Sequence, residues 1–226
     1  MIGKINEIFS SIQGEGIFLG EKQIFVRLAG CNIRCCSYCD TEFESFQEYR
    51  PQELLSRLES FGRDFHSISL TGGEPLLQKD FLKEILPLLK QKRYQTYLET
   101  NGVLPGALAE VINNIDIVAM DIKLPSSSTN IAKSYWQEHG DFLKIAGKKD
   151  VFIKVVISSS TTEEDFVTML ALFSAIDYCG ILVLQPNSFE VLDKLNEKLA
   201  VFKKLSAGYL IPTCIIPQMH KVMGIK

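Results

Sequence analysis

Four of the six cysteines lie within nine residues of one another, at Cys31, Cys35, Cys36 and Cys39. Clustered cysteines in a chain that begins without a signal peptide favour metal binding over disulfides. A structural zinc site normally takes a second pair of cysteine or histidine ligands, and none of the three histidines stands at such a spacing. Three or four thiolates in one loop are more typical of an iron–sulfur cluster, and a zinc site is the alternative.

The spacing leaves open which three thiolates would bind a cluster. The set Cys31, Cys35 and Cys39 has three residues in each gap, whereas Cys31, Cys36 and Cys39 have four and then two. Because the side chains of adjacent residues diverge, we do not expect Cys35 and Cys36 to bind together.

Six short apolar segments predict β-strands, and each is followed by a segment with helical spacing of its apolar residues. The strands are expected at 24–29, 67–70, 96–99, 115–120, 151–157 and 181–184. The helices are expected from Pro51, near 81–89, near 105–113, near Tyr135, from Thr161 or Thr162, and over 189–205. This alternation predicts an α/β fold with parallel strands. Six units are too few for a complete eight-stranded barrel, so we expect a partial (β/α)6 TIM-type barrel.

Polar and glycine-rich turns follow these predicted strands. The cysteines follow the first strand, Thr-Gly-Gly-Glu-Pro at 71–75 follows the second, and Glu-Thr-Asn-Gly at 99–102 follows the third. Asp-Ile-Lys at 121–123 follows the fourth strand. Turns collect such residues in any protein, but four cysteines beside a Gly-Gly-Glu turn exceed that tendency. We therefore predict an enzyme with its active site at the C-terminal ends of the parallel strands.

The composition limits the partners and the location of the chain. Its 226 residues carry 24 basic and 27 acidic side chains, a formal charge of −3, and 46% of them are hydrophobic. This balance gives no reason to expect nucleic-acid binding. No apolar run approaches the roughly 18 residues of a membrane span. We expect one globular domain over residues 1–226, in the cytoplasm and with no membrane partner.

Taken in order, the motifs resemble those of the radical S-adenosylmethionine (SAM) superfamily, and within it the 7-carboxy-7-deazaguanine synthase family. The resemblance covers nearly the whole chain. The matching segments are Phe-Ser-Ser-Ile-Gln-Gly-Glu-Gly at 9–16, Phe-Val-Arg-Leu-Ala-Gly-Cys-Asn at 25–32, Tyr-Cys-Asp-Thr at 38–41, the turns at 71–75, 99–102 and 121–123, and Gln-Met-His-Lys at 218–221. Without the resemblance, His220 and Lys221 are expected in a solvated tail.

The resemblance implies a [4Fe–4S] cluster on three thiolates, with an open iron that chelates SAM and generates a 5′-deoxyadenosyl radical. The family pattern has three residues and then two between its cysteines, so this chain carries one residue more. We favour Cys31, Cys36 and Cys39 as ligands, because the short turn before Cys39 keeps Tyr38 in register with the cluster. Cys35 is the alternative middle ligand.

The resemblance also assigns residues to the cofactor. Gly72 and Gly73 would let the backbone approach the methionyl group of SAM, where a Cβ would obstruct it. Glu74 would add a charge or fix that turn, and Tyr38 would support the adenine. The weaker assignments around the cofactor are Glu99, Asn101, Lys123, Ser126 and Gln185.

The implied reaction converts 6-carboxy-5,6,7,8-tetrahydropterin to 7-carboxy-7-deazaguanine with loss of ammonia, after a hydrogen leaves the carbon that bears the carboxylate. The positions assigned to the substrate are Ile12, Gln13, Gly14, Arg27 and Thr71, with Glu15 in the same loop as a catalytic candidate alongside Arg27.

Two further assignments concern charge. Arg27 stands in an otherwise apolar strand, where an arginine needs an anionic partner. That partner is either the substrate carboxylate or an acidic neighbour in a structural ion pair. The family position at Thr41 is tied to Mg²⁺, an ion that prefers oxygen ligands.

Two other functions are open at this point. Queuine lyase resembles the same family and cleaves queuine to release 7-aminomethyl-7-deazaguanine, whose guanine-like edge suits the same loop. A zinc-binding module is the alternative from another class. For the enzymes we expect a pterin or 7-deazapurine base as substrate, a one-electron donor such as flavodoxin or ferredoxin, and a homodimer.

Overall fold

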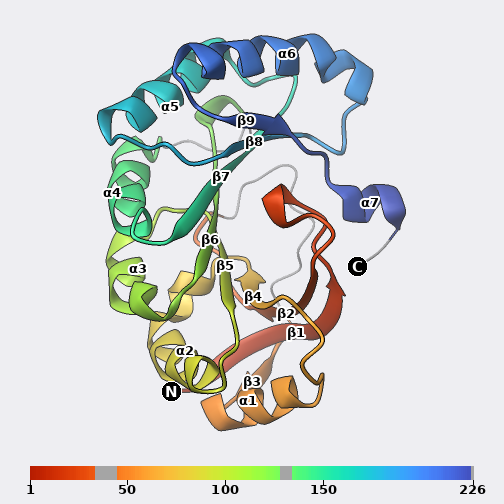
Figure 1. Ribbon diagram of the computed structural model, residues 1–226, viewed down its shortest axis with the longest axis vertical. Coiled ribbons are helices and arrows are strands. Elements are labelled where there is room, and N and C mark those ends of the chain that lie inside the picture. Colours follow the sequence, from red (N-terminus) through yellow and green to blue (C-terminus); the bar gives the residue numbers. More distant parts are fainter. Residues whose placement is uncertain (34–44, 128–133, 225–226) are drawn as a thin grey trace.

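A curved, mostly parallel β-sheet forms the frame of this computed structural model, which describes residues 1–33, 45–127 and 134–224 (Figure 1). Within these residues nine strands form one sheet, in the order β3-β1-β2-β4-β5-β6-β7-β8-β9. Their bounds are β1 Gly3–Ile12, β2 Lys22–Leu28, β3 Gln47–Tyr49, β4 Ser67–Gly72, β5 Thr96–Thr100, β6 Ile117–Ile122, β7 Asp150–Ile157, β8 Leu182–Pro186 and β9 Thr213–Ile215. β1 is antiparallel to β2 and β3, and every pairing from β2 to β9 is parallel.

The helices cover the outer side of the arc. Figure 1 shows α1 to α6 along the convex side of the sheet, while α7 lies at the open side beside the N-terminal loop. Their bounds are α1 Pro51–Glu59, α2 Lys79–Gln91, α3 Pro105–Val111, α4 Trp136–Ala146, α5 Glu163–Ala175, α6 Leu192–Gly208 and α7 Met219–Met223, with short 3-10 helices at Gly16–Phe18, Pro75–Gln78, Ile112–Asn114 and Pro125–Ser127. No helix among the described residues is both long enough and apolar enough to cross a membrane.

Two hydrophobic clusters hold the sheet in place. The larger one lies between sheet and helices and includes fully buried Leu58, Leu82 and Phe166. The smaller one consists of Tyr97, Ile117, Ala119, Phe152 and Val183, with Phe18 packed against it. Since each fully buried large apolar side chain contributes about 1.5–3 kcal/mol, both faces of the parallel strands are stabilised by burial.

The six parallel strands predicted from the sequence are confirmed as β2 and β4 to β8, and the partial barrel is confirmed with them. The prediction missed β1, β3 and β9, which extend the sheet at both edges. The helix expected over 189–205 instead spans Leu192–Gly208. The predicted cap of α5 is Thr162, whose hydroxyl accepts a hydrogen bond from the Asp165 N–H at 3.3 Å.

Candidate functional site

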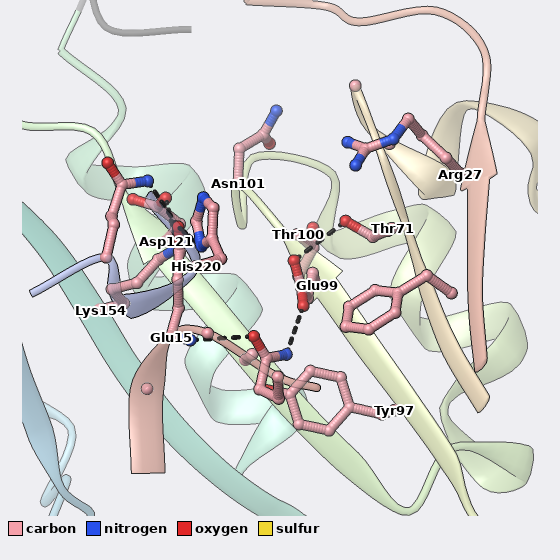
Figure 2. Close-up of a pocket in the computed structure, with 18 of the residues that line it drawn as sticks. Glu15, Arg27, Thr71, Tyr97, Glu99, Thr100, Asn101, Asp121, Lys154 and His220 are labelled. Atoms are coloured by element: carbon pink, nitrogen blue, oxygen red, sulfur yellow. Dashed lines mark hydrogen bonds and ion pairs between the residues drawn. The ribbon is translucent and has the colours of Figure 1, made fainter. Parts of the chain in front are cut away.

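A cavity of about 700 Å³ lies inside the arc, at the C-terminal ends of the parallel strands (Figure 2). Its size falls within the usual range for small-molecule sites. The predicted residues that line it are Ile12, Gln13, Gly14, Glu15, Arg27, Cys31, Thr71, Gly72, Gly73, Glu99, Asn101, Lys123 and Gln185. The fold therefore gathers side chains from both ends of the sequence into one wall.

The loop of residues 12–16, which begins at the last residue of β1, is fixed by side-chain hydrogen bonds. The Gln13 side-chain nitrogen donates to Glu99 Oε1 at 2.9 Å, and its oxygen accepts from the Glu15 backbone N–H at 3.0 Å. The other Glu99 oxygen accepts from the Thr71 hydroxyl at 2.9 Å. Glu99 therefore joins two residues predicted to meet the substrate, as the dashed lines of Figure 2 show.

Close packing of two glycines brings this loop against the C-terminal segment and β7. A Cβ on Gly14 would lie 2.6 Å from the Cβ of His220, and one on Gly16 would lie 2.6 Å from the Phe152 ring. The Gly14 carbonyl accepts from the Met219 N–H at 2.9 Å. The expectation of a solvated tail is therefore wrong for His220, whose side chain is 25% exposed and lines the cavity.

Glu15 lies at the centre of a largely buried group of charges, whose side chains on Glu15, Lys154 and Asp121 are 17%, 14% and 18% exposed. Its carboxylate forms an ion pair with Lys154 Nζ and accepts from Gln218 Nε2 at 2.5 Å. Lys154 Nζ also lies 3.4 Å from Asp121 Oδ2, and Asp121 is the residue of β6 that pairs with Lys154 in the sheet. Burial alone would raise the pKa of Glu15, but the Lys154 cation and the Gln218 amide lower it to about 2. A carboxylate ionised so strongly suits the acceptance of hydrogen bonds better than the abstraction of a proton.

The Gly-Gly-Glu turn packs directly against the start of the cysteine loop. Gly72 has a φ of +135°, and a Cβ there would lie 2.1 Å from the Leu28 carbonyl oxygen. A Cβ on Gly73 would lie 2.1 Å from the Gly30 carbonyl oxygen and 2.7 Å from Cys31 Cβ. The family resemblance implies that both glycines make room for SAM. The structure adds a nearer reason, because only residues without a Cβ bring this turn against the start of the cysteine loop.

Glu74 is fully buried and fixes the same turn. Its carboxylate accepts from the Leu76 N–H at 3.0 Å, the Asn101 N–H at 2.8 Å and the Thr100 hydroxyl at 2.9 Å. The Asn101 side chain in turn donates to Asn32 Oδ1 at 2.8 Å, beside the first cysteine. Burial raises the pKa of Glu74 to about 7, although these hydrogen bonds lower it. Of the two roles expected for Glu74, its contacts support the fixing of the turn.

Arg27 projects into the cavity from the end of β2 (Figure 2). Its Nε lies 3.2 Å from Glu7 Oε2, and its guanidinium carbon lies 5.8 Å from the centroid of the Phe9 ring. Thr71 is its register neighbour on β4. The acidic neighbour considered in the sequence argument is therefore present, and Arg27 also lines the cavity.

The other cofactor candidates lie near the ends of β6 and β8. Lys123 forms an ion pair with Asp121 at 2.8 Å. Asp121 Oδ1 and Gln185 Oε1 are buried acceptors with no hydrogen-bond partner in the described part of the chain. Such atoms indicate a bound ligand or water that donates to them. Ser126 instead accepts from the Thr162 N–H at 3.0 Å, and it is not among the described residues that line the cavity.

Most of the cysteine loop lies outside the described residues. The assignments of Cys35, Cys36 and Cys39, of Tyr38 and of Thr41 stay predictions for this reason. Cys31 is described, lines the cavity, and has its Sγ 3.2 Å from the Ile33 carbonyl oxygen.

Several polar residues of the cavity wall were not predicted from the sequence, above all Lys154 and Gln218. Lys154 carried a usable signal, because it interrupts the apolar strand at 151–157 just as Arg27 interrupts its own strand. Gln218 stands in the tail motif, but nothing in the sequence indicates that the tail returns to the N-terminal loop.

Comparison with known proteins gives the family. The sequence profile of the Radical SAM superfamily matches residues 26–173. A 7-carboxy-7-deazaguanine synthase of Geobacter sulfurreducens is 35% identical to this chain, over 98% of the chain and 97% of that protein. One from Methanothermobacter thermautotrophicus is also 35% identical, over 100% of the chain and 99% of that protein.

Solved structures show the same fold. QueE from Escherichia coli aligns with a TM-score of 0.67 at 21% identity, over 95% of this chain and 94% of that one. A TYW1 structure with a lysine-pyruvate adduct bound aligns with a TM-score of 0.60 at 13% identity, over 82% of this chain and 73% of that one. On the profile match and on these relatives, the chain belongs to the radical SAM superfamily and, within it, to the family of the 7-carboxy-7-deazaguanine synthases.

Proposed function

We propose that this radical SAM enzyme converts 6-carboxy-5,6,7,8-tetrahydropterin to 7-carboxy-7-deazaguanine, with loss of ammonia. The observation that carries the proposal is the shared cavity. Cys31 and Gly73 line one part of its wall, and the loop of residues 12–16 lines another. The names of the relatives, which match over nearly their whole length, support the same reaction.

The cavity fits the cofactors that the superfamily uses, a [4Fe–4S] cluster and SAM. When bound, they supply a 5′-deoxyadenosyl radical that takes a hydrogen atom from the substrate. We assign the cluster to Cys31, Cys36 and Cys39, with Cys35 as the alternative to Cys36. Asp121 Oδ1 and Gln185 Oε1, which are buried acceptors without a partner among the described residues, suit a polar ligand with hydrogen-bond donors, as SAM is. Gly72, Gly73, Asn101 and Lys123 complete this group of cavity residues.

The rest of the cavity suits a bicyclic base with a donor edge. Glu15 is ionised and Glu99 is held by Gln13 and Thr71, so carboxylate oxygens are fixed where ring N–H and amino groups would donate. We assign the substrate carboxylate to Arg27, whose cation lines the cavity. These residues would bind and orient the pterin and exclude water, while the hydrogen transfer follows from proximity.

Several finer features belong to the same proposal. We propose Mg²⁺ near Thr41 as a bridge to substrate oxygen atoms. We also propose one domain over residues 1–226, a homodimer, a cytoplasmic location, and a flavodoxin or ferredoxin as the one-electron donor. Metal analysis, sedimentation and reduction assays test these features one at a time.

Anaerobic turnover analysed by mass spectrometry tests the reaction. The reconstituted, reduced protein with SAM is given the tetrahydropterin or queuine in parallel. We expect 7-carboxy-7-deazaguanine from the pterin and no product from queuine. Release of 7-aminomethyl-7-deazaguanine from queuine, with no reaction of the pterin, would show a queuine lyase instead. Bound zinc without iron and sulfide would exclude radical chemistry altogether.

A further inference from the structure

Lys154 is a charged residue of the cavity that neither the motifs nor the family resemblance indicates. It stands in the middle of β7 between the buried Ile153 and Val155, and its side chain is only 14% exposed. A buried ammonium group is costly unless it is paired and hydrogen-bonded. Lys154 forms ion pairs with Glu15 and Asp121. Its role therefore depends on what it does for these two carboxylates.

The two partners depend on Lys154 to different degrees. Asp121 already has Lys123 Nζ at 2.8 Å, compared with 3.4 Å to Lys154. Glu15 has only the ring of His220, 3.9 Å away, as another cationic group among the described residues, and that ring is charged only when protonated. Removal of Lys154 would therefore leave Asp121 paired and Glu15 buried without a permanent counter-charge.

Glu15 also links three segments that are far apart in the sequence. One of its oxygens pairs with Lys154 on β7, and the other accepts from Gln218 just before α7. Figure 2 shows Lys154 reaching toward Glu15 across the cavity wall. The backbone bond from Met219 to Gly14 follows the same path. The carboxylate thus joins β7, the N-terminal loop and the C-terminal segment at the edge of the cavity.

We propose that Lys154 is a positioning residue, which acts through Glu15 to hold the loop of residues 12–16 in the geometry that binds the heterocycle. The inference rests on the proposed function, because it takes the base of that reaction as the ligand of the loop. Lys154 itself does not react, since both of its partners hold it as a cation within the ion pairs.

Binding of 7-carboxy-7-deazaguanine to the reconstituted holoenzyme with SAM, by anaerobic equilibrium dialysis, tests the proposal without turnover. Lys154→Met should weaken binding about 10-fold or more, because a charge-assisted hydrogen bond contributes roughly a factor of 10 to 150. Lys154→Arg should bind within about 3-fold of the wild type, since it keeps the cation. The affinity for SAM, measured by calorimetry, should change by less than about 3-fold in both variants, because Asp121 keeps its ion pair with Lys123.

A double-variant cycle separates action through Glu15 from a general loss of structure. Glu15→Gln with Lys154→Met should bind the base within about 3-fold of Glu15→Gln alone, because the lysine then has nothing to hold. If the two contributions were independent, the double variant would instead bind the base at least about 10-fold more weakly than Glu15→Gln alone. The double variant removes both charges together, so the comparison holds even where Lys154→Met alone does not fold.

Lys90→Met is the matched control. Lys90, on α2, pairs at 2.5 Å with Asp116, which lies just before the start of β6. Lys154 pairs with Asp121, which lies toward the end of that strand. The control should bind the base as the wild type does. Two results would overturn the role of Lys154 and leave the proposed function standing, provided that the wild type turns over the pterin. One is that Lys154→Met binds the base as tightly as the wild type does. The other is that the losses of the two single variants multiply in the double variant. A wild type that neither binds the base nor turns over the pterin would overturn the proposed function and this inference with it.

Discussion

At the scale of single residues, Arg27 carries the interaction that separates the two candidate substrates. The pterin has a carboxylate where queuine has an amine-linked side chain. Arg27→Met should therefore lower kcat/KM for the pterin by a factor of roughly 10 to 150, the range of a charge-assisted hydrogen bond. Release of 5′-deoxyadenosine without substrate should not change. Arg57→Met, an exposed arginine on α1 over the Phe61 ring, is the control. An unchanged kcat/KM in Arg27→Met would assign the arginine to its ion pair with Glu7 alone.

Gly73 tests whether the Gly-Gly-Glu turn supports the cysteine loop. A methyl group there would meet the Gly30 carbonyl and Cys31, and overpacking of this kind costs about 1–3 kcal/mol. Gly73→Ala should lower the iron content after reconstitution and weaken SAM binding about 10-fold. Gly106→Ala on α3 has no atom within 4 Å of its new Cβ, so iron and SAM binding should match the wild type. Full iron content in Gly73→Ala would contradict the packing argument.

The site residues that could be predicted from the sequence are those whose type is unusual for the predicted strand or turn in which they stand. Arg27 in an apolar strand and glycines before a glutamate stand out without a structure. Gln218 does not, because its role depends on a return of the tail to residues 12–16 that no local pattern encodes. Two partners of Glu74 are hidden for the same reason, since Thr100 and Asn101 lie at and just after the end of β5, far from Glu74 in the sequence.

At the scale of elements, α6 ends in a strained but hydrogen-bonded turn. The Leu210 N–H donates to the Ala207 carbonyl and the Ile211 N–H to the Ser206 carbonyl, each at 3.0 Å, as in a Schellman motif. Leu210 has a φ of 59° and is 87% exposed, so it bears the steric cost of the left-handed region with little packing in return. Leu210→Gly should raise the free energy of unfolding by about 0.5–1 kcal/mol in urea titrations.

The control for this turn is Ala207→Gly in the last turn of the same helix. It should lower the free energy of unfolding by about 1 kcal/mol, because glycine is a poor helix former. A Leu210→Gly variant that is destabilised as well would show that the leucine side chain packs on something other than solvent.

Which elements were predictable follows from their length and burial. The strands β2 and β6 to β8 are mainly apolar because helices or the inner cluster cover both faces. β4 and β5 are shorter and carry several serine and threonine residues, and the glycine-containing turns that follow them mark their ends in the sequence. β1 is an antiparallel strand near the sheet edge with many half-exposed residues, so its apolar signal is weak. β9 has three residues and α7 has five, too few for any period to appear.

At the scale of the whole molecule, the buried Glu15 links stability to pH. Its pKa is lowered from 4.5 to about 2 on folding, so its contribution is present above pH 4.5 and is lost as the pH falls toward 2. The shift corresponds to about 3 kcal/mol at neutral pH. The wild type should therefore have a higher free energy of unfolding than Glu15→Gln at pH 5, and the difference should disappear as the pH falls to 2. Urea unfolding at each pH measures it.

Glu110 provides a contrast within the same chain. Hydrogen bonds from Lys79 and Lys83 also lower its pKa to about 2, but this group lies at the surface. Salt screens exposed pairs much more than buried ones. The measured quantity is the difference in free energy of unfolding between the wild type and each variant. At high salt the pH dependence of this difference should shrink for Glu110→Gln and persist for Glu15→Gln. If salt reduced it equally for both variants, Glu15 would be open to solvent.

The central claim is that one cavity holds SAM and the pterin in contact. Transfer of deuterium from a pterin labelled at the carbon that bears the carboxylate tests it most directly. The account predicts deuterium in the 5′-deoxyadenosine, by mass spectrometry of anaerobic reactions, and none from a pterin labelled on the adjacent ring carbon. Formation of product with unlabelled 5′-deoxyadenosine would contradict the account.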